Sequence, residues 1–541
     1  MADPLAVVNQ SPPLENVNFF TIDSCLRDAL CTHGNLAEDP ALTAVGELAG
    51  SREALSHVLP ANQNPPVLRT HDRYGHRIDE VDFHPSWHWL MDKAVGFGLQ
   101  AAPWTSDRPS PHLARAAGFY LWSQVEPGHG CPISMTYAAV PALKASPELA
   151  AEWIPSLAAT SYDARRLRAG DKAGALAGMG MTEKQGGSDV RANLTTATPS
   201  GSDGEYLLNG HKWFCSAPQV DVFLVLAQAP DGLTCFVVPR VLADGNRNAF
   251  ALQRLKEKLG NRSNASSEVE FHGTIGYRLG DEGAGVRTII EMVAATRLDC
   301  VLGSAALMRR ALVEATWHAS HRSAFGGLLA DKPAMQNVLA DLALESEAAT
   351  ALSMRLAAAV DASLGGDEQA ASFRRIALPL AKFWVCKRTS MTVAEALECL
   401  GGNGYVEESG LPLLFRESPL NSIWEGSGTV NALDVLRALR RPESLDAWLT
   451  EVGAARGADH RLDAAITGVL ESLADQSDAE AGARRLAARM AACLQASLLI
   501  RYSTHEVADA FVASRLGDDW GGVFGTLPRT TPFAAIIDRV L

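Results

Sequence analysis

The spacing of apolar residues divides the chain into a helical, a strand-like and a second helical region. Up to about Leu176, apolar residues recur at helical spacing between proline-containing loops, as in 112–125 and 135–143. From about Ala177 to Tyr277 they instead form short alternating or β-branched runs between turns, which are typical of strands. We therefore expect a helical domain over 1–176 and a small β domain over 177–277. The strand-like runs are 206–208, 220–226, 234–238 and 268–271.

Helical spacing returns beyond Gly285, and the glycines of the run 280–285 predict a turn into a helix rather than a phosphate-binding loop, since two acidic residues stand among them. Leu411-Pro412 interrupts this region, and Arg441-Pro442 indicates a hinge into a last unit with its own apolar stripe. We expect a helical bundle over 278–440 and an additional helical domain over 441–541. The predicted fold is a multidomain α+β protein with helical, β, helical and further helical parts.

Composition excludes several classes of protein. The chain has 541 residues and a net charge of −14, which disfavours general attraction to nucleic acid or anionic membrane. No apolar stretch is long enough to span a membrane, and the start lacks a signal-like segment, so we expect a cytoplasmic protein. The nine cysteines contain no CxxC pair, which argues against a zinc site or a disulfide framework.

A loose group of histidines and aspartates raises the question of a metal. Pro85 interrupts the helical pairing of His84 with His88, so we expect surface histidines and no metal site. The other members of the group are His71, Asp72, His76 and Asp82.

The run 178–190 combines glycines with hydroxyl-bearing residues. Glycine lets backbone N–H groups approach phosphate oxygens closely, and Thr182 and Ser188 can each donate a hydrogen bond. By itself such a run is more often an ordinary turn than a ligand-binding loop. In this position, at the junction of the helical and β regions, it predicts a bound cofactor.

Five motifs in one order make the chain similar to the flavin-dependent acyl-CoA dehydrogenases. The resemblance is closest to the AidB-like, alkylation-response branch of that family and spans nearly the whole chain, with the last hundred residues matching least clearly. It implies the acyl-CoA dehydrogenase fold and bound FAD. The motifs are Met-Thr-Glu to Gly-Ser-Asp-Val at 181–190, Gly-x-Lys-x-aromatic-x-Ser at 210–216, Arg-x-x-Phe-Gly at 322–326, Leu-Gly-Gly-x-Gly-Tyr at 400–405 and aromatic-Glu-Gly-Ser at 424–427.

The resemblance also implies roles for single residues. Thr182 would bond the flavin ring and Ser188 the pyrophosphate, while Phe214 would cover a face of the isoalloxazine and Ser216 would bond near N5. A strand places Phe214 and Ser216 on one face, as this arrangement requires. Further cofactor-binding residues implied in the same way are Met181, Gly187, Ser427 and Thr429.

Other motif residues are expected to serve a neighbouring subunit. In the family, which commonly forms tetramers as pairs of dimers, Arg322 would meet a pyrophosphate shared across the interface and Phe325 would pack near the adenine. Gly401 and Gly402 would let the backbone of the neighbouring chain approach. Glu398 departs from the glutamine common in the family, and a carboxylate would repel phosphates, so we leave it out of the site.

Glu425 occupies the position of the family's catalytic base. The family removes a proton alpha to a thioester while a hydride leaves the beta carbon for flavin N5, and a desolvated carboxylate suits the first step. Other members place the base on the helix that contains Thr296-Arg297, but threonine cannot do this. We expect Arg297 and Trp424 to contact substrate. Without the motif, Glu425 would read as a carboxylate at a helix N-terminus.

Three functions remain open. The first is an FAD-dependent dehydrogenase of acyl-CoA-like thioesters that passes electrons to a carrier flavoprotein. The second is a DNA-associated alkylation-response flavoprotein with only residual dehydrogenase activity. After Arg441, however, acidic residues outnumber arginines, so duplex binding through Arg484, Arg485 and Arg489 should be weak. The third is an oxidase of a nitroalkane or other small carbon acid, which would ordinarily use a shorter carboxylate.

Overall fold

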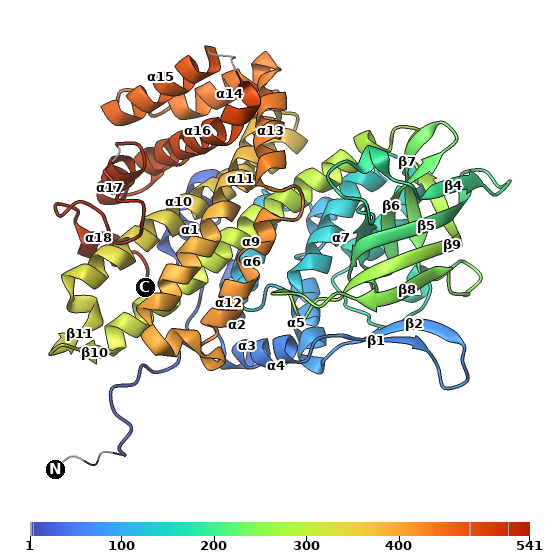
Figure 1. Cartoon of the computed structure of the whole chain (residues 1–541), viewed down its shortest axis with the longest axis horizontal. Coiled ribbons are helices and arrows are strands. Elements are labelled where there is room, and N and C mark those ends of the chain that lie inside the picture. The colour runs from blue at the N-terminus through green and yellow to red at the C-terminus, as the bar shows by residue number, and fades with distance from the viewer. Residues whose placement is uncertain (1–2, 4, 475–477, 518) are drawn as a thin grey trace. The chain divides into compact units, whose positions relative to one another are not determined.

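The structure is a computed structural model that describes residues 3, 5–474, 478–517 and 519–541. It separates into two compact units, each described by itself (Figure 1). The helical unit comprises Met1–Leu55, His112–Val125 and Cys300–Leu541, and the β unit comprises Ser56–Pro111 and Glu126–Asp299. Helix α9 (Gly285–His321) belongs to both units, since its first 15 residues precede Cys300.

The β unit is built around a seven-stranded sheet that closes on itself. Strand β6 pairs with β3, β4 and β7, while β9 pairs with β5, β7 and β8, and β4 with β5, so that five strands complete a ring. Most pairs are antiparallel, but β3 and β4 run parallel to β6. The strands are β3 (Ala177–Gly180), β4 (Thr196–Pro199), β5 (Glu205–Ser216), β6 (Val222–Ala229), β7 (Gly232–Pro239), β8 (Phe250–Leu255) and β9 (Ser266–Leu279).

The pattern of side chains explains the position of these strands. Seven of the eight residues of β6 are buried, as expected for a strand covered on both faces. In β5, by contrast, buried and exposed residues alternate over its first half, so one face meets the core of the barrel. The predicted β region is thereby confirmed, with β3, β4 and β8 in addition to the four runs expected.

Helices and a hairpin complete the β unit. The hairpin of β1 (Val67–His71) and β2 (Arg77–Asp82) was not predicted. Its Asp79 is fixed to the barrel, because the Arg240 guanidinium donates to the Asp79 carbonyl at 3.3 Å and the Leu252 amide donates to the Asp79 carboxylate at 3.0 Å. The helices are α4 (Val58–Gln63), α5 (Pro85–Gly96), α7 (Gly130–Leu143) and α8 (Pro147–Ala158).

Three long helices, α9, α10 and α11, form the centre of the helical unit, with α1 and α16 packed on α10 (Figure 1). Their long runs of buried alanine and leucine allow close helix packing. The order of helical, β and helical regions predicted from sequence is confirmed. The helices are α1 (Ser24–Gly34), α2 (Pro40–Ala49), α3 (Arg52–Ser56), α6 (Pro111–Ser123), α10 (Pro333–Leu364), α11 (Glu368–Cys399), α12 (Leu411–Glu417), α13 (Gly428–Leu439), α14 (Pro442–Gly453), α15 (His460–Ala474), α16 (Ala479–Tyr502), α17 (His505–Arg515) and α18 (Phe533–Ile537), with a hairpin of β10 (Ser323–Ala324) and β11 (Gly327–Leu328).

A buried ionic network joins the last helices to α10 and α11. Arg515 of α17 reaches Asp341 at 2.6 Å and Glu345 at 3.2 Å, and Arg388 of α11 binds Glu345 through two hydrogen bonds. The side chains are all less than a tenth exposed. The helices after Arg441 therefore belong to the same packed body as α10 and α11. The predicted domain boundaries at 176, 277 and 440 remain predictions.

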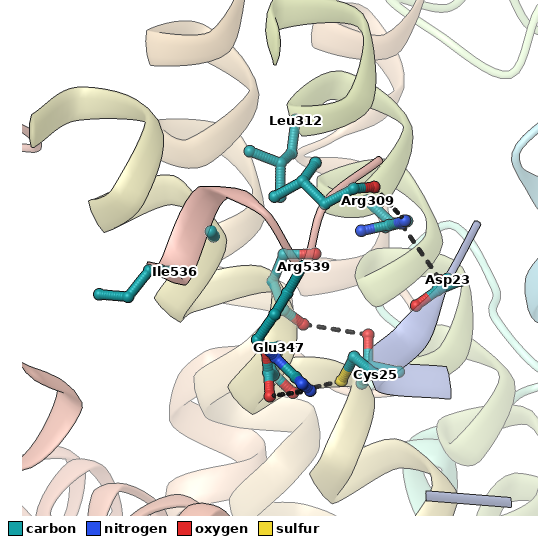
Figure 2. Close-up of a pocket in the computed structure, with 11 residues that line it drawn as sticks. Asp23, Cys25, Arg309, Leu312, Glu347, Ile536 and Arg539 are labelled. Atoms are coloured by element: carbon teal, nitrogen blue, oxygen red, sulfur yellow. Dashed lines mark hydrogen bonds and ion pairs between the residues drawn. The ribbon is translucent and has the colours of Figure 1, made fainter. Parts of the chain in front are cut away.

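The C-terminal segment packs against the first helix around a small pocket in the helical unit (Figure 2). Arg539 forms an ion pair with Glu347 at 2.9 Å, and Arg309 pairs with Asp23 at 3.2 Å while donating to the Val540 carbonyl at 2.7 Å. The Ser24 hydroxyl donates to the Arg539 carbonyl at 2.8 Å. The pocket's charges are thus paired within the chain.

Among the described residues, no helix is both long and apolar enough to cross a membrane.

Candidate functional site

The glycine-rich loop after β3 lies against strand β5 in the β unit. The Trp213 amide donates to the Thr182 carbonyl at 2.8 Å, and the Asn193 side chain donates to the Met181 carbonyl at 3.0 Å. A Cβ atom at Gly187 would lie 2.4 Å from the Thr182 hydroxyl oxygen, so only glycine fits there. The structure therefore brings Met181, Thr182 and Gly187 together, with Ser188 exposed next to them.

A buried ion pair fixes this loop. The Lys212 ammonium donates to the Glu183 carboxylate at 2.7 Å and to the Leu226 carbonyl at 2.7 Å. The Glu183 carboxylate also accepts hydrogen bonds from the amides of Leu194 at 2.6 Å and Thr195 at 3.2 Å. Burial alone would raise the pKa of Glu183, but the Lys212 ammonium and these hydrogen bonds lower it to about 2. Glu183 is therefore ionised and braces the loop from both ends.

Strand β5 presents Phe214 and Ser216 beside the loop. The Phe214 side chain is 52% exposed, whereas Ser216 is half-buried with its hydroxyl 3.4 Å from that of Ser266. The ring of Phe214 also lies 4.7 Å from the Lys256 ammonium. An aromatic ring this exposed, close to a glycine loop with hydroxyl groups, leaves a surface that a planar ligand would cover. The residues present in the β unit thus fit a flavin ring.

In the helical unit, Glu425 lies in a tightly held loop between Leu420–Ser422 and α13. Glu425 has a φ of 58° and Gly426 a φ of 98°, so two consecutive residues have left-handed backbone conformations. The Trp424 indole donates to the Asn421 side chain at 2.9 Å, and the Asn431 side chain donates to the Gly426 carbonyl at 2.6 Å. Trp424 and Glu425 are both half-buried. The loop therefore has a defined shape.

Lys382 of α11 binds this loop through its side-chain ammonium. Its ammonium donates to the carbonyl oxygens of Asn421 at 2.5 Å, Trp424 at 2.9 Å and Gly426 at 3.2 Å. Neither the role of Lys382 nor the Glu183–Lys212 pair was predicted from the sequence. Lys212 and Glu183 lie inside the recognised motifs. A lysine at a core-facing position of a strand needs a buried partner, so Lys212 could have indicated this ion pair. Lys382 had no comparable local signal.

Ser427 and Thr429 are exposed at the start of α13. Ser427 is the N-cap residue, yet its side chain makes no capping hydrogen bond to the helix. Gly401 and Gly402 are likewise exposed, in the turn Gly401–Tyr405 that follows α11, and Gly401 has a φ of 58°. All four predicted residues thus offer backbone or hydroxyl groups at the surface of the helical unit.

Arg322 and Phe325 lie on the β10–β11 hairpin, a separate element of the helical unit. Phe325 is 95% exposed at its tip. Arg322 donates to the Asn9 carbonyl, and the Ser323 amide donates to the Asn9 side chain at 2.7 Å. The N-terminal arm is thus fastened to the residue predicted to meet a pyrophosphate. Sequence reasoning did not anticipate this contact.

Arg297 lies on the part of α9 that belongs to the β unit and is half-buried. Its neighbour Thr296 is 4% exposed and donates its hydroxyl to the Met292 carbonyl at 3.2 Å, within the same helix. The Thr296 hydroxyl is therefore engaged by the backbone of its own helix. Arg297 is the one predicted residue of the described β unit that lies on a helix. The other predicted residues of this unit lie in the loop after β3 or on strand β5.

The histidine group of the N-terminal region has local partners. His76 pairs with Asp72 at 3.0 Å, and His88 lies 2.8 Å from the Tyr162 hydroxyl. Pro85 begins α5, and His84 caps it. Within residues 3, 5–474, 478–517 and 519–541, no group of three or more possible metal ligands occurs.

Comparison with known proteins gives consistent matches along the chain. Residues 9–164 match the adaptive response protein AidB N-terminal domain, 178–274 the acyl-CoA dehydrogenase middle domain and 283–440 its C-terminal domain. A protein of Escherichia coli (strain K12) that carries the name "Putative acyl-CoA dehydrogenase AidB" is 45% identical, covering 96% of this chain and 95% of its own.

Solved structures agree with these matches. Caenorhabditis elegans ACDH-11, solved in complex with C11-CoA, has a TM-score of 0.86 at 26% identity, covering 95% of this chain and 93% of its own. An acyl-CoA dehydrogenase of Bacillus anthracis complexed with FAD shares the fold, with a TM-score of 0.64 at 18% identity, covering 95% of this chain and 85% of its own.

Proposed function

Because the chain belongs to the acyl-CoA dehydrogenase family and to its AidB-like branch, we propose that it oxidises acyl-CoA-like thioesters with FAD as cofactor and Glu425 as base. The observation that carries the proposal is the Glu425 loop, in which a half-buried carboxylate residue keeps a left-handed backbone conformation. A fixed carboxylate is what abstraction of a weakly acidic C–H proton needs.

The β unit would hold the isoalloxazine. Thr182 and Ser216 would donate hydrogen bonds to the ring, the exposed ring of Phe214 would cover one of its faces, and Ser188 would meet the pyrophosphate. Met181 and Gly187 shape the loop around Thr182. FAD, when bound, would supply a planar acceptor for the hydride. In the helical unit, the Ser427 hydroxyl and Thr429 would contribute to FAD binding.

Glu425 would remove the alpha proton of the thioester, and Arg297 and Trp424 would contact the substrate. The C11-CoA in the ACDH-11 structure supports a fatty acyl thioester as the substrate class. Electrons would then pass to a carrier flavoprotein. A poorly solvated carboxylate is a stronger base, and the half-burial of Glu425 supports that role.

A second copy of the chain would complete the cofactor site. The 95% exposure of Phe325 and the exposed Gly401 and Gly402 support a homo-oligomer in which these residues and Arg322 meet the cofactor of a neighbouring copy. A dimer of dimers, as in the family, is the proposed assembly. Sedimentation of the parent and of Phe325→Ala, together with their FAD content, would test it.

Anaerobic titration with a panel of acyl-CoA thioesters tests the proposed function. The parent should bleach at its flavin band with at least one chain length, and Glu425→Gln should keep its FAD but bleach roughly 10³-fold more slowly, as expected for loss of a general base. Glu408→Gln, an exposed glutamate of the same unit, serves as the matched control and should behave as the parent does. A colourless protein that refuses FAD, or unimpaired bleaching of Glu425→Gln, would contradict the proposal.

A second candidate, association with DNA in an alkylation response, is favoured by the adaptive-response domain at 9–164 and by exposed Arg484, Arg485 and Arg489 on α16. After Arg441, acidic residues outnumber arginines, and no lysine stands after Lys387 to neutralise phosphates. We therefore infer weak duplex binding that is lost by physiological salt. Retention of a fluorescent duplex at that salt, abolished by Arg484→Ala with Arg485→Ala, would instead support this function.

A further inference from the structure

Lys382 is a charged side chain in the interior of the helical unit. It is 1% exposed, and the three acceptors of its ammonium are main-chain carbonyl oxygens of one short loop, at 2.5, 2.9 and 3.2 Å. Burying an ammonium group is costly unless its hydrogen-bonding capacity is used. Here the loop supplies three acceptors, one for each N–H group of the ammonium.

The three carbonyls meet at one point only because of the path of the loop. They belong to Asn421, Trp424 and Gly426, and the chain must turn back on itself to aim them at a single nitrogen atom. The turn occurs at Glu425 and Gly426, with φ values of 58° and 98°. A glutamate rarely adopts a positive φ, because its Cβ approaches the backbone, so outside contacts must hold it there.

Asn431 supports the same turn from the other side. Its side-chain amide donates to the carbonyls of Gly426 at 2.6 Å and Ser427 at 3.1 Å, and Asn431 is fully buried. Asn431 belongs to the first turn of α13, whereas Lys382 lies on α11. The residues around Glu425 are thus held between two helices, with Lys382 contributing a cationic contact to the loop.

We propose that Lys382 is a positioning residue for Glu425: its ammonium gathers the three carbonyls and so fixes the direction of the Glu425 side chain. This inference rests on the proposed function for its catalytic consequence, but not for its structural part. Lys382 touches no reacting atom in this scheme. Its removal would leave the loop free to relax, Glu425 would lose its left-handed conformation, and the carboxylate would spend little time in a productive direction.

Lys382→Ala with chemical rescue provides the test. Relative to lysine, alanine lacks a propylammonium group, so added propylammonium should enter the space and restore the three hydrogen bonds, while propanol should not. Amide hydrogen exchange of the peptide covering 421–431 should speed up in Lys382→Ala and slow again with propylammonium. In the FAD-loaded protein, flavin reduction should fall about 100-fold, with the substrate concentration for half-maximal rate little changed, and should recover at least partly with the amine.

Two further variants separate positioning from folding. Lys382→Met replaces the lysine with an uncharged thioether side chain of similar length, so it should fold even if Lys382→Ala does not. Its 421–431 peptide should exchange fast with no response to amine. Trp384→Phe loses the 2.8 Å hydrogen bond to Gln495 from the same helix and should leave exchange at 421–431 unchanged.

The outcomes distinguish this inference from the proposed function. Parent-like exchange at 421–431 in both Lys382 variants, or a folded, FAD-loaded Lys382→Ala that no amine improves, would overturn the positioning role. A parent that no thioester reduces would instead overturn the proposed function, and the exchange measurements would still decide whether Lys382 orders the loop.

Discussion

Glu183 and Lys212 form an ion pair with 2.7 Å between the carboxylate oxygen and the ammonium nitrogen, and neither side chain is exposed to solvent. Removing one partner leaves the other charged and buried, which costs about 3–5 kcal/mol. We therefore expect Glu183→Gln to lower the free energy of unfolding by roughly that amount and to reduce FAD content, because the 181–195 loop loses its brace. Urea unfolding and the flavin absorbance of purified protein measure both quantities.

Arg287→Ala is the control for that prediction. Arg287 and Asp281 form an exposed pair, with side chains 77% and 84% exposed, so its loss should change stability by no more than about 0.5–1 kcal/mol. Equal effects of the two substitutions would show that the Glu183–Lys212 pair contributes no more than a surface contact.

His33 should make the protein sensitive to acid. Burial, reinforced by the nearby Arg355 guanidinium, lowers the pKa of His33 from 6.5 to about 4. Between these values the unfolded chain binds a proton that the folded chain does not, so stability falls as pH drops from about 6.5 to 4, by up to about 3 kcal/mol from this residue. Urea unfolding of the parent and of His33→Phe across that range should show a shallower pH dependence in the variant. Parallel curves would contradict the prediction.

Cys31 should be the fast-reacting thiol. It is exposed, whereas the other eight of the nine cysteines are buried, and burial raises the pKa of Cys215, Cys235, Cys399 and Cys493 to about 12. Because the thiolate is the reactive form, native protein should give one rapid equivalent with an aromatic disulfide reagent. Cys31→Ser should abolish that phase while denatured protein still reacts. Rapid labelling of Cys31→Ser would show that the buried sites open readily.

Arg539 should be important for stability although it lies far from Glu425 in sequence. Arg539→Met would leave Glu347 without its 2.9 Å ionic partner in a pocket beside α1, at a cost of about 3 kcal/mol (Figure 2). Thermal unfolding of this variant should begin at a clearly lower temperature. Arg529→Met replaces an exposed arginine of the same segment and should stay close to the parent.

Much of the fold could be predicted because its local patterns are strong. The apolar run at 220–226 and the alternation in β5 gave the barrel, and the helical spacing beyond Gly285 gave the long helices; the family assignment is confirmed. The β1–β2 hairpin was not predicted because its residues are mostly polar and half-exposed, so no apolar face marks it in the sequence. Its position depends on arginine contacts from residues such as Arg240, far along the chain.

The residues of the candidate site also fall into two groups, those marked by local sequence and those recognised only from the structure. Motif residues such as Thr182, Phe214 and Glu425 are contiguous with recognisable neighbours, and their cofactor and catalytic roles remain predictions. Lys382 stands 42 positions before Trp424, inside a helix that contains several other polar and charged residues, so nothing in the local pattern marks it. Only the three-dimensional path of the loop shows what that lysine contacts. Partnerships between distant polar residues are set by tertiary packing, which local spacing does not encode.

The contacts of Arg539 with α1, which are made through Ser24 and Asp28, have a consequence for biosynthesis. The helical unit draws on residues before 56 and beyond 299, and α1 packs against Arg539, which the ribosome makes 515 residues after Ser24. During translation, the surface of α1 that contacts Arg539 therefore stays uncovered until that residue has emerged from the ribosome. The barrel strands, all encoded between 177 and 279, have every partner available well before that moment and can pair while synthesis continues.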